Sequence, residues 1–338
     1  MKVAIVTGCS AGIGVETVRG LAGDDSYEKI VCAVRNPKKM SIAMVESGYS
    51  AKMIAKCEIV ELNLASLNSV DQFIERLKDL QITRIDRLVL NAGTKDYSRN
   101  DRHTTVDGID EIWQINYFAN FYLVCAISPI LTATPGSRVV LVSSVMHWLG
   151  SSDAISNLTV DGATQGGLGL WSTYRDSKFA ITVLGSELRG RGIDTIVVNP
   201  GAVASDIWRN WYSFYLIGPL IRMLVSLLFL SCLDGAQTTL YACRDLEGKS
   251  EQYLAYLSPY GHAKSRWEII SVLTDMYWFW IHKDQRRFVG RCCKRAEDQV
   301  VGSRVWRRSI EVISKTSLYR ADICNSMRHY RKNEIEKQ

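Results

Sequence analysis

Two side chains that could exchange a proton stand four residues apart, Tyr174 and Lys178. On a helix this spacing places both on one face. A phenol in isolation has a pKa of about 10, too high for easy proton exchange near neutrality, and a neighbouring ammonium lowers it. Ser144 offers a hydroxyl that could hold an oxygen atom beside the phenol. A Tyr–Lys pair alone is usually a surface pair, so its meaning depends on the motifs that accompany it.

A glycine-rich segment near the N-terminus predicts a site for a pyrophosphate. Residues 7–14, Thr-Gly-Cys-Ser-Ala-Gly-Ile-Gly, follow an apolar run and open a helical pattern. Glycines let the backbone turn tightly and approach the phosphates, and the helix N-terminus offers free N–H groups and partial positive charge. The alternative is a tight structural turn. The residues expected to contact a dinucleotide here are Gly8, Ser10, Gly12, Ile13 and Gly14.

The end of the next apolar run favours a phosphorylated cofactor. A dinucleotide with a free ribose 2′-hydroxyl usually meets Asp or Glu about 20 residues past the glycines, and residues 31–35 contain neither. They end instead in Arg35, with Lys38 and Lys39 just beyond. A guanidinium can grip a 2′-phosphate with two hydrogen bonds, so we expect NADP(H) in preference to NAD(H). The alternative is that these cations are solvated charges at a helix start.

The elements that must position these residues alternate along the first 200 positions. Short runs rich in Val, Ile and Leu, typical of buried parallel strands, are 3–7, 30–34, 58–62, 87–90, 138–142 and 195–198. Helical patterns cover 12–22, 37–47, 67–80, 108–131 and 171–189. This alternation predicts an α/β fold with a doubly wound, mostly parallel sheet and helices on both faces. Residues 147–170, rich in Gly and Ser, are expected to form a long loop.

Further motifs follow in the order of one family. Asn91-Ala92-Gly93 comes after the fourth run, Ser144 ends the fifth, and Tyr174 with Lys178 forms a Tyr-x-x-x-Lys motif. With these, the chain resembles the short-chain dehydrogenase/reductase family over about residues 1–257. The resemblance implies a Rossmann sheet and reversible hydride transfer between a nicotinamide dinucleotide and a carbonyl/alcohol pair.

The resemblance also implies a role for each matched residue. Tyr174 would be the acid/base, Lys178 would lower its pKa and hold the nicotinamide ribose, Ser144 would position the substrate, and Asn116 would support a proton relay. Asn63 stands where the related branch usually has an Asp that meets the adenine, and its amide can still donate and accept. Besides Tyr174 and Lys178, the further implied cofactor contacts are Asn63, Leu64, Asn91, Ala92, Gly93, Pro200, Gly201, Val203 and Ser205.

Within the family the chain is similar to the retinol dehydrogenase and WW-domain oxidoreductase branch. That likeness is carried by residues 64–70, 105–108 and 234–241. A weaker likeness, in 277–280 and 304–306, connects the tail to light-dependent protochlorophyllide reductases. Those enzymes usually have a cysteine after the Pro-Gly, where this chain has alanine.

The substrate side predicts a small lipophilic molecule. Residues 207–215 are rich in aromatic side chains and would form an apolar wall suited to a retinoid, a steroid or a fatty aldehyde. The alternative is that these aromatics are simply core. Two other functions stay open: a non-catalytic dinucleotide-binding scaffold or redox sensor, and a pigment reductase of the protochlorophyllide type.

Charge divides the 338 residues into two expected parts. Residues 262–338 carry 17 Lys and Arg against 9 Asp and Glu, whereas residues 1–261 carry 24 against 26. We therefore expect a catalytic domain over 1–261 and a basic, helical, aromatic-containing extension over 262–338. The extension could meet an anionic membrane surface, together with the apolar segment 211–233, or present a solvated face. Nucleic acid is not an expected partner. The family resemblance allows a homodimer, because family members often pair through the helices after the fourth and fifth strands.

Composition limits the class of protein. With 47% hydrophobic and 22% charged residues the chain is typical of a globular protein, which excludes a disordered or fibrous one. Nine scattered cysteines without metal-ligand spacing favour a reduced intracellular compartment, without a metal site or a disulfide framework. No signal or N-terminal anchor pattern is found, so we expect a location in the cytoplasm or peripheral to an internal membrane.

Overall fold

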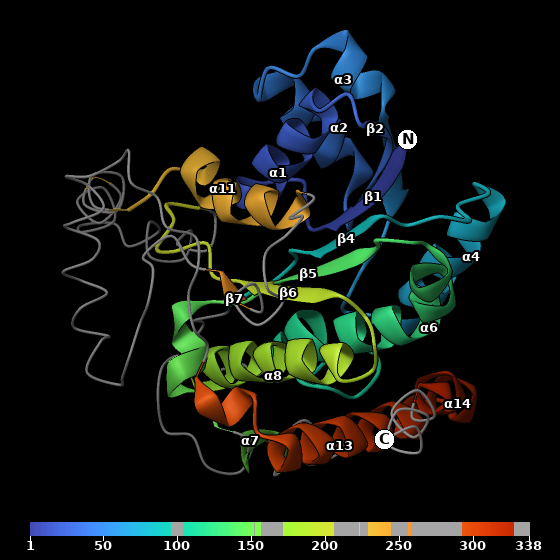
Figure 1. The fold of residues 1–338 in the computed structure, drawn as a ribbon, viewed down its shortest axis with the longest axis vertical. Coiled ribbons are helices and arrows are strands. Elements are labelled where there is room, and N and C mark those ends of the chain that lie inside the picture. The colour runs from blue at the N-terminus through green and yellow to red at the C-terminus, as the bar shows by residue number, and fades with distance from the viewer. Residues whose placement is uncertain are drawn as a thin grey trace.

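A seven-stranded parallel sheet forms the centre of the protein, in the order β3-β2-β1-β4-β5-β6-β7 (Figure 1). This computed structural model describes residues 1–95, 104–151, 153–156, 172–205, 223, 229–244, 256–257 and 293–327. The strands are β1 (Lys2–Thr7), β2 (Tyr27–Val34), β3 (Cys57–Glu61), β4 (Arg87–Leu90), β5 (Arg138–Val142), β6 (Thr195–Val198) and β7 (Tyr256–Leu257). Every neighbouring pair is parallel, which confirms the predicted doubly wound α/β fold.

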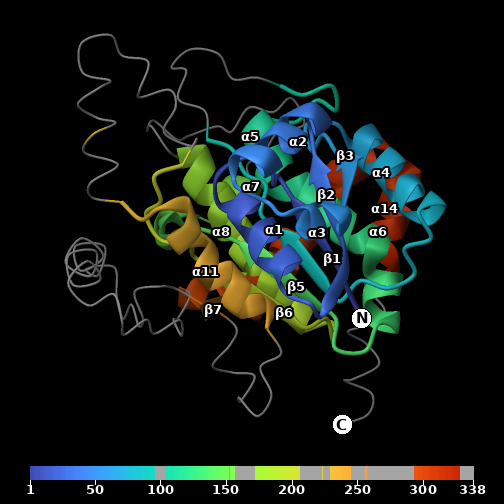
Figure 2. The same cartoon turned by 90° about the horizontal axis from the view of Figure 1, so that it is seen from above.

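Helices cover both faces of this sheet. One face carries α1 (Gly12–Gly23), α2 (Pro37–Glu46), α3 (Ala51–Ala55) and α11 (Cys232–Cys243). The other carries α4 (Leu67–Asp79), α5 (Glu111–Trp113), the π-helical turn η1 (Gln114–Phe118), α6 (Ala119–Ala133) and α8 (Ser172–Arg189). Seen from above, α1 and α11 lie side by side (Figure 2), where Gly20 leaves room for Leu240.

Local sequence explains where these elements begin. Asn36 caps α2 by accepting a hydrogen bond from the Lys39 N–H, 3.0 Å away, and Pro37 occupies the first turn. Ser66 caps α4 in the same way, and the side chains that α4 then buries recur at helical spacing. The predicted ends of α1, α2, α4 and α8 lie within one residue of the observed ones.

Several local features differ from the sequence prediction, among them the short helix α3, which was not predicted. The two-residue strand β7 was not predicted, because so short a run has no periodicity. The helix predicted over 108–131 contains the π-helical turn η1. Part of the predicted long loop is helical, in the 3₁₀ turn η2 (Val145–Leu149) and α7 (Asp153–Ser156), and residues 157–170 lie outside the described residues.

The described part of the C-terminal extension is helical, as predicted, and packs on the sheet's helical layer. It consists of the 3₁₀ turn η5 (Lys294–Ala296), α13 (Gln299–Thr316) and α14 (Leu318–Ser326), which lie below α8 and α6 in Figure 1. Trp306 meets Phe121 edge-on, with ring centroids 4.9 Å apart. The guanidinium of Arg191 lies 3.6 Å over the Trp306 ring. These contacts place α13 in the same hydrophobic core as α6 and α8.

Several basic residues of the extension have specific partners in the body. Arg320 donates to Asp71 Oδ2 from two nitrogens, at 2.9 and 2.7 Å, and Tyr122 donates to the other oxygen of that carboxylate at 2.6 Å. Arg304 forms an ion pair with Asp153 at 3.7 Å. The Arg320 charge therefore binds α14 to the body, whereas the Arg304 pair lies exposed at the surface. Pairing of two copies through α6 and α8 would have to displace or include these helices.

One helical stretch among the described residues is long and apolar enough to cross a membrane, Glu111–Ala133. Its most apolar window is 72% buried within the fold, as expected of a core helix. The predicted apolar segment 211–233 falls largely outside the described residues, as does the predicted domain boundary at residue 261.

Replacing Trp306 tests whether α13 is an integral part of the core. We expect Trp306→Ala to lower the free energy of unfolding by about 3–5 kcal/mol, because it removes a buried indole and leaves a cavity. Urea unfolding followed by circular dichroism measures this loss. Arg307→Ala, at an exposed neighbouring position, is the control and should change the free energy by less than about 0.5 kcal/mol. An equally small effect of Trp306→Ala would contradict the packing.

Candidate active site

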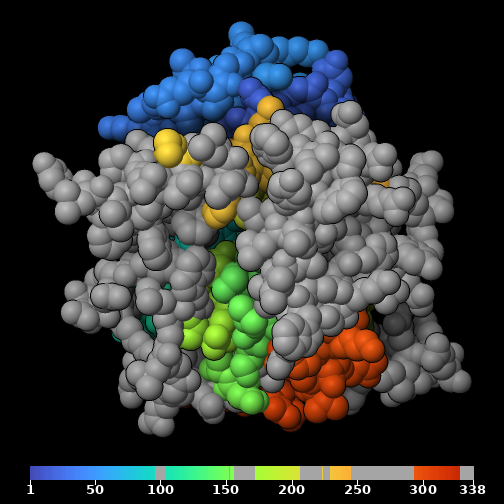
Figure 3. Space-filling model, turned by 90° about the vertical axis from the view of Figure 1, so that its left-hand side faces the viewer, coloured from blue at the N-terminus to red at the C-terminus, as the bar shows by residue number. Residues whose placement is uncertain are grey.

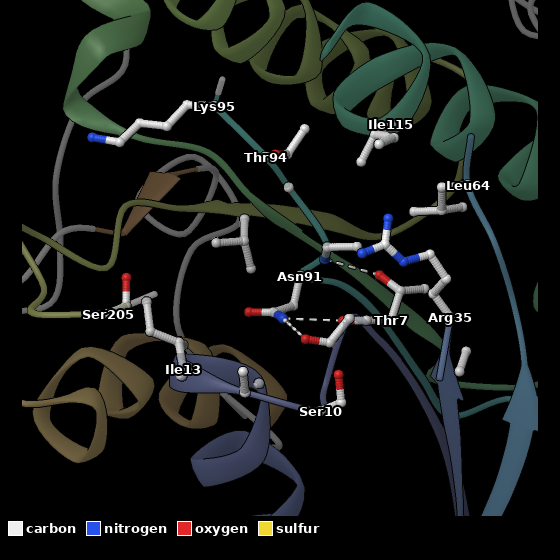
Figure 4. Close-up of a pocket in the computed structure, with 18 of the residues that line it drawn as sticks. Thr7, Ser10, Ile13, Arg35, Leu64, Asn91, Thr94, Lys95, Ile115 and Ser205 are labelled. Atoms are coloured by element: carbon white, nitrogen blue, oxygen red, sulfur yellow. Dashed lines mark hydrogen bonds between the residues drawn. The ribbon is translucent and has the colours of Figure 1, made fainter. Parts of the chain in front are cut away.

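A pocket of about 540 Å³ opens at the carboxyl ends of the strands (Figure 4). It lies where the strand order reverses between β1 and β4, the place where open α/β sheets bind ligands. Most of the predicted site residues line it: Gly8, Ser10, Gly12, Ile13, Gly14, Arg35, Asn63, Leu64, Asn91, Ala92, Gly93, Tyr174, Lys178, Pro200 and Ser205. The other four, Asn116, Ser144, Gly201 and Val203, lie directly behind or beside that lining.

The glycine segment is held against the end of β4. The Asn91 side-chain amide donates to the carbonyls of Thr7 and Gly8, at 3.0 and 3.1 Å. Gly8 has a φ of +63°, and a Cβ there would lie 2.7 Å from Ala92 Cα, so no other residue fits.

The first turn of α1 supplies donors to the pocket. Ala11 stands at the N-cap and has no side chain that could bond the first N–H groups of the helix. These groups remain free for an anion, as a pyrophosphate requires. The cradle left by the glycines and these donors fit a dinucleotide.

Cations line the end of the pocket nearest β2 and β3. Arg35 follows β2 and reaches over the pocket beside Leu64 (Figure 4), and Lys39 of α2 also lines the pocket. Nearby, Asn63 Oδ1 accepts a hydrogen bond from the Ala65 N–H at 3.1 Å, a bond that an aspartate would also make. Asn63 therefore stabilises the local turn through this bond and lines the pocket.

The catalytic candidates Ser144, Tyr174 and Lys178 meet where β5 ends against α8. The Lys178 ammonium donates to the Val142 carbonyl at 2.9 Å and lies 5.7 Å from the centroid of the Tyr174 ring. The Ser144 hydroxyl forms a hydrogen bond with the Tyr174 side chain. One hydroxyl and one phenol are thus directed to a common place, with an ammonium beside them.

The acidity of Tyr174 differs from the sequence expectation. Burial raises the pKa of Tyr174 to about 12, and the hydrogen bond from Ser144 only partly offsets this. Lys178 was expected to lower it, but burial also lowers the pKa of Lys178 to about 8, and its ammonium is engaged by Val142. Loss of water is therefore the main cause of both pKa shifts in the protein alone.

Asn116 is fully buried in the π-helical turn η1. Its Oδ1 accepts from the Thr94 N–H at 2.7 Å, and its amide donates to the Thr94 carbonyl at 2.8 Å and to Ser177 Oγ at 3.0 Å. The backbone that Asn116 binds also passes close to Lys178, since a Cβ on the neighbouring Gly93 would lie 3.1 Å from Lys178 Nζ. Asn116 thus fixes the backbone that follows β4, and its part in a proton relay stays a prediction.

The pocket also contains residues that sequence reasoning missed. Lys95 is buried, lies at the Ser205 end of the pocket opposite Arg35, and has a pKa lowered by burial to about 7 (Figure 4). The sequence signal that could have identified Lys95 was its position two residues after the Asn91-Ala92-Gly93 motif. Ser143 Oγ bonds the Lys178 carbonyl at 3.0 Å and Thr182 Oγ1 at 2.8 Å, which joins β5 to α8.

A parallel α/β sheet whose pocket joins a glycine cradle to a Tyr–Lys pair is the arrangement typical of dinucleotide-dependent oxidoreductases. The profile of the family described as short chain dehydrogenase matches residues 2–215. The chain therefore belongs to the short-chain dehydrogenase/reductase family.

Relatives of known name support the same branch as the sequence motifs. Human WW domain-containing oxidoreductase is 31% identical over 265 residues, which cover 75% of this chain and 61% of that protein. Mouse polyprenol dehydrogenase is 31% identical over 283 residues, covering 78% of this chain and 79% of that protein. The chain thus spans about three-fifths of the length of the WW domain-containing relatives.

Solved structures share the fold. An uncharacterized protein from Mycobacterium paratuberculosis matches with a TM-score of 0.62 and 25% identity, covering 93% of this chain and 94% of that one. The NADPH-bound carbonyl reductase from chicken fatty liver matches with a TM-score of 0.53 and 20% identity, covering 76% and 95%. At that identity, the second likeness supports the fold alone.

The buried ammonium of Lys178 predicts a pH-dependent stability. Below pH 8 the folded and unfolded chains both carry its proton, so the cost of burying the charge is fully present. Between pH 8 and 10.5 the folded chain loses that proton while the unfolded chain keeps it, so stability rises with pH. Lys178→Met removes this dependence.

Urea unfolding at pH 7 to 10.5 measures the difference in unfolding free energy between Lys178→Met and the wild type. We expect the variant's relative stability to fall by about 3 kcal/mol at most across that range, from 1.36 kcal/mol per pKa unit. Lys38→Met, at an exposed position outside the pocket lining, is the control. A difference that does not change with pH would show that Lys178 keeps an ordinary pKa.

Proposed function

We propose that the protein interconverts a carbonyl and an alcohol on a lipophilic substrate with NADP(H). The observation that carries this proposal is that one pocket is lined by the glycine cradle, Arg35, Tyr174 and Lys178, with Ser144 bonded to Tyr174 beside it. A nicotinamide dinucleotide needs phosphate-binding groups and proton-transferring groups in one pocket.

The charges of the pocket support a phosphorylated dinucleotide. The described lining residues include one carboxylate, Glu111, and four basic side chains, Arg35, Lys39, Lys95 and Lys178. Arg35 and Lys39 approach from β2 and α2, where an adenosine 2′-phosphate would lie. The glycine cradle and the first turn of α1 would hold the pyrophosphate, and Lys178 would hold the nicotinamide ribose.

The protein residues would supply geometry and proton transfer, and the bound dinucleotide would supply or accept the hydride. Tyr174 would donate a proton to the substrate oxygen during reduction and recover it during oxidation. The Ser144 hydroxyl, already bonded to Tyr174, would hold that same oxygen. Burial raises the pKa of Tyr174 to about 12, so the phenol carries its proton at neutral pH and can act as the acid in reduction.

A lipophilic substrate is supported by the relatives rather than by the described pocket walls. Polyprenol dehydrogenases from mouse and zebrafish are 31% and 32% identical to this chain. Residues 207–215, expected to form the apolar wall, lie outside the described residues. Such a substrate suits an intracellular enzyme, in the cytoplasm or against an internal membrane. Consumption of NADPH with retinal, steroid ketones, medium-chain aldehydes and long isoprenoid aldehydes would identify the class.

Tyr174→Phe separates catalysis from cofactor binding. We expect kcat to fall about 10²- to 10⁴-fold, because the variant lacks the hydroxyl that transfers the proton. The NADPH dissociation constant, measured by fluorescence titration, should stay within about twofold because the phosphate-binding groups are untouched. Tyr319→Phe, at an exposed position, is the control. Turnover or cellular effects that survive unchanged in Tyr174→Phe would favour the scaffold or redox sensor instead.

Arg35→Ala tests the choice of cofactor. Loss of a charge-assisted pair of hydrogen bonds should raise the KM for NADPH about ten- to a hundredfold, while the KM for NADH stays nearly constant. Initial rates with each cofactor measure the two values. Lys38→Ala, whose side chain is exposed beside but not in the pocket lining, is the matched control. A wild-type preference for NADH would refute the proposed role of Arg35.

A further inference from the structure

The imidazole of His147 lies between the backbone of Ser144 and the start of the C-terminal helices. Its Nδ1 is 2.7 Å from the Ser144 carbonyl oxygen, and its Nε2 is 3.3 Å from the Cys293 backbone nitrogen. A carbonyl can only accept, so Nδ1 carries the hydrogen, and a backbone N–H can only donate, so Nε2 accepts it. The side chain is fully buried, and burial lowers its pKa to about 4, so it stays neutral.

The C-terminal segment also binds the other end of the turn η2, through Arg295. Arg295 donates to the Gly150 carbonyl at 2.9 Å and to the Trp148 carbonyl at 3.3 Å. Its guanidinium also lies 5.4 Å from the ring centroid of Phe179 on α8. In the side view the red C-terminal residues adjoin the green residues of this region (Figure 3). The turn that begins at Ser144 is therefore held at both ends by residues 293–295.

Ser144 depends on that turn for its position. It is the N-cap of η2, where its hydroxyl accepts a hydrogen bond from the Met146 N–H at 3.3 Å. The same hydroxyl bonds Tyr174. A shift of the Ser144 backbone would move this hydroxyl relative to the phenol, and a displacement of about 1 Å at a reacting centre can cost about 10²-fold in rate.

We propose that His147 is a positioning residue that couples the C-terminal segment 293–327 to Ser144, so that this segment forms part of the catalytic apparatus. The inference rests on the proposed function, since it concerns the geometry of that same site. The C-terminal segment would then act close to the reacting groups, although it begins more than 140 positions after Ser144 in the chain. His147 itself does not line the pocket.

Two His147 variants and one in the segment test the coupling. His147→Phe keeps the ring volume but loses both hydrogen bonds, and we expect kcat to fall about ten- to a hundredfold with the NADPH dissociation constant within about twofold. His147→Asn can still donate to the Ser144 carbonyl but does not reach Cys293, so its loss should be smaller. Arg295→Gln perturbs the turn from the C-terminal side and should also lower kcat. Arg304→Gln, in the same segment but paired with exposed Asp153, is the matched control.

A double-mutant cycle separates positioning from a general loss of stability. If His147 acts through Ser144, then adding His147→Phe to Ser144→Ala should lower kcat by less than about twofold further, although it lowers kcat strongly in the wild-type background. Equal losses in the two backgrounds would overturn the coupling, as would full kcat in His147→Phe. Should His147→Phe not fold, the same cycle with Arg295→Gln decides. A wild-type chain that binds NADPH but reduces no carbonyl would refute the proposed function, and the inference with it.

Discussion

The buried ammonium of Lys178 is the constraint on which the site and its surroundings depend. A Cβ on Gly93 would lie 3.1 Å from its Nζ, closer than an ordinary contact, and its hydrogen bond ends on the Val142 carbonyl at the tip of β5. The carbonyl of Lys178 is in turn held by Ser143, so both the side chain and the backbone of this residue are fixed to the same strand. The position of α8, and with it Tyr174, follows from these bonds.

Lys178 stays buried because the helix that carries it, α8, is packed on both sides. Toward the sheet, Gly185 lets α8 approach β6 closely, and toward α13, Gly302 gives space to the Glu187 side chain. Glu187 forms a buried ion pair with Arg191, whose guanidinium stacks on Trp306. Such a pair stabilises little by itself, but leaving one of its charges buried without the other is strongly destabilising. Trp306 of α13 packs on Arg191, so the pair needs α13 to stay buried.

The sequence predicted the sheet and most of the pocket because both depend on local patterns. Apolar runs sufficed to place six strands, and the glycine segment gave five of the fifteen predicted lining residues, whereas about half of the fifteen were implied by the family resemblance. The failures have a common physical origin in contacts between distant segments. Counting charge identified a basic tail but could not show that Arg320 binds Asp71, 249 positions earlier. The acidity of Tyr174 shows the same limit, because the spacing to Lys178 is visible in the sequence, whereas the loss of water that raises the pKa of the phenol is not.

The docking of α13 and α14 onto α6 and α8 also has a consequence for biosynthesis. The apolar faces of α6 and α8 leave the ribosome more than a hundred residues before the helices that cover them. At elongation rates of about 5–20 residues per second, this delay is on the order of ten seconds. During that interval the nascent chain presents an uncovered hydrophobic surface, which makes it a client for chaperones and gives the finished fold a high contact order.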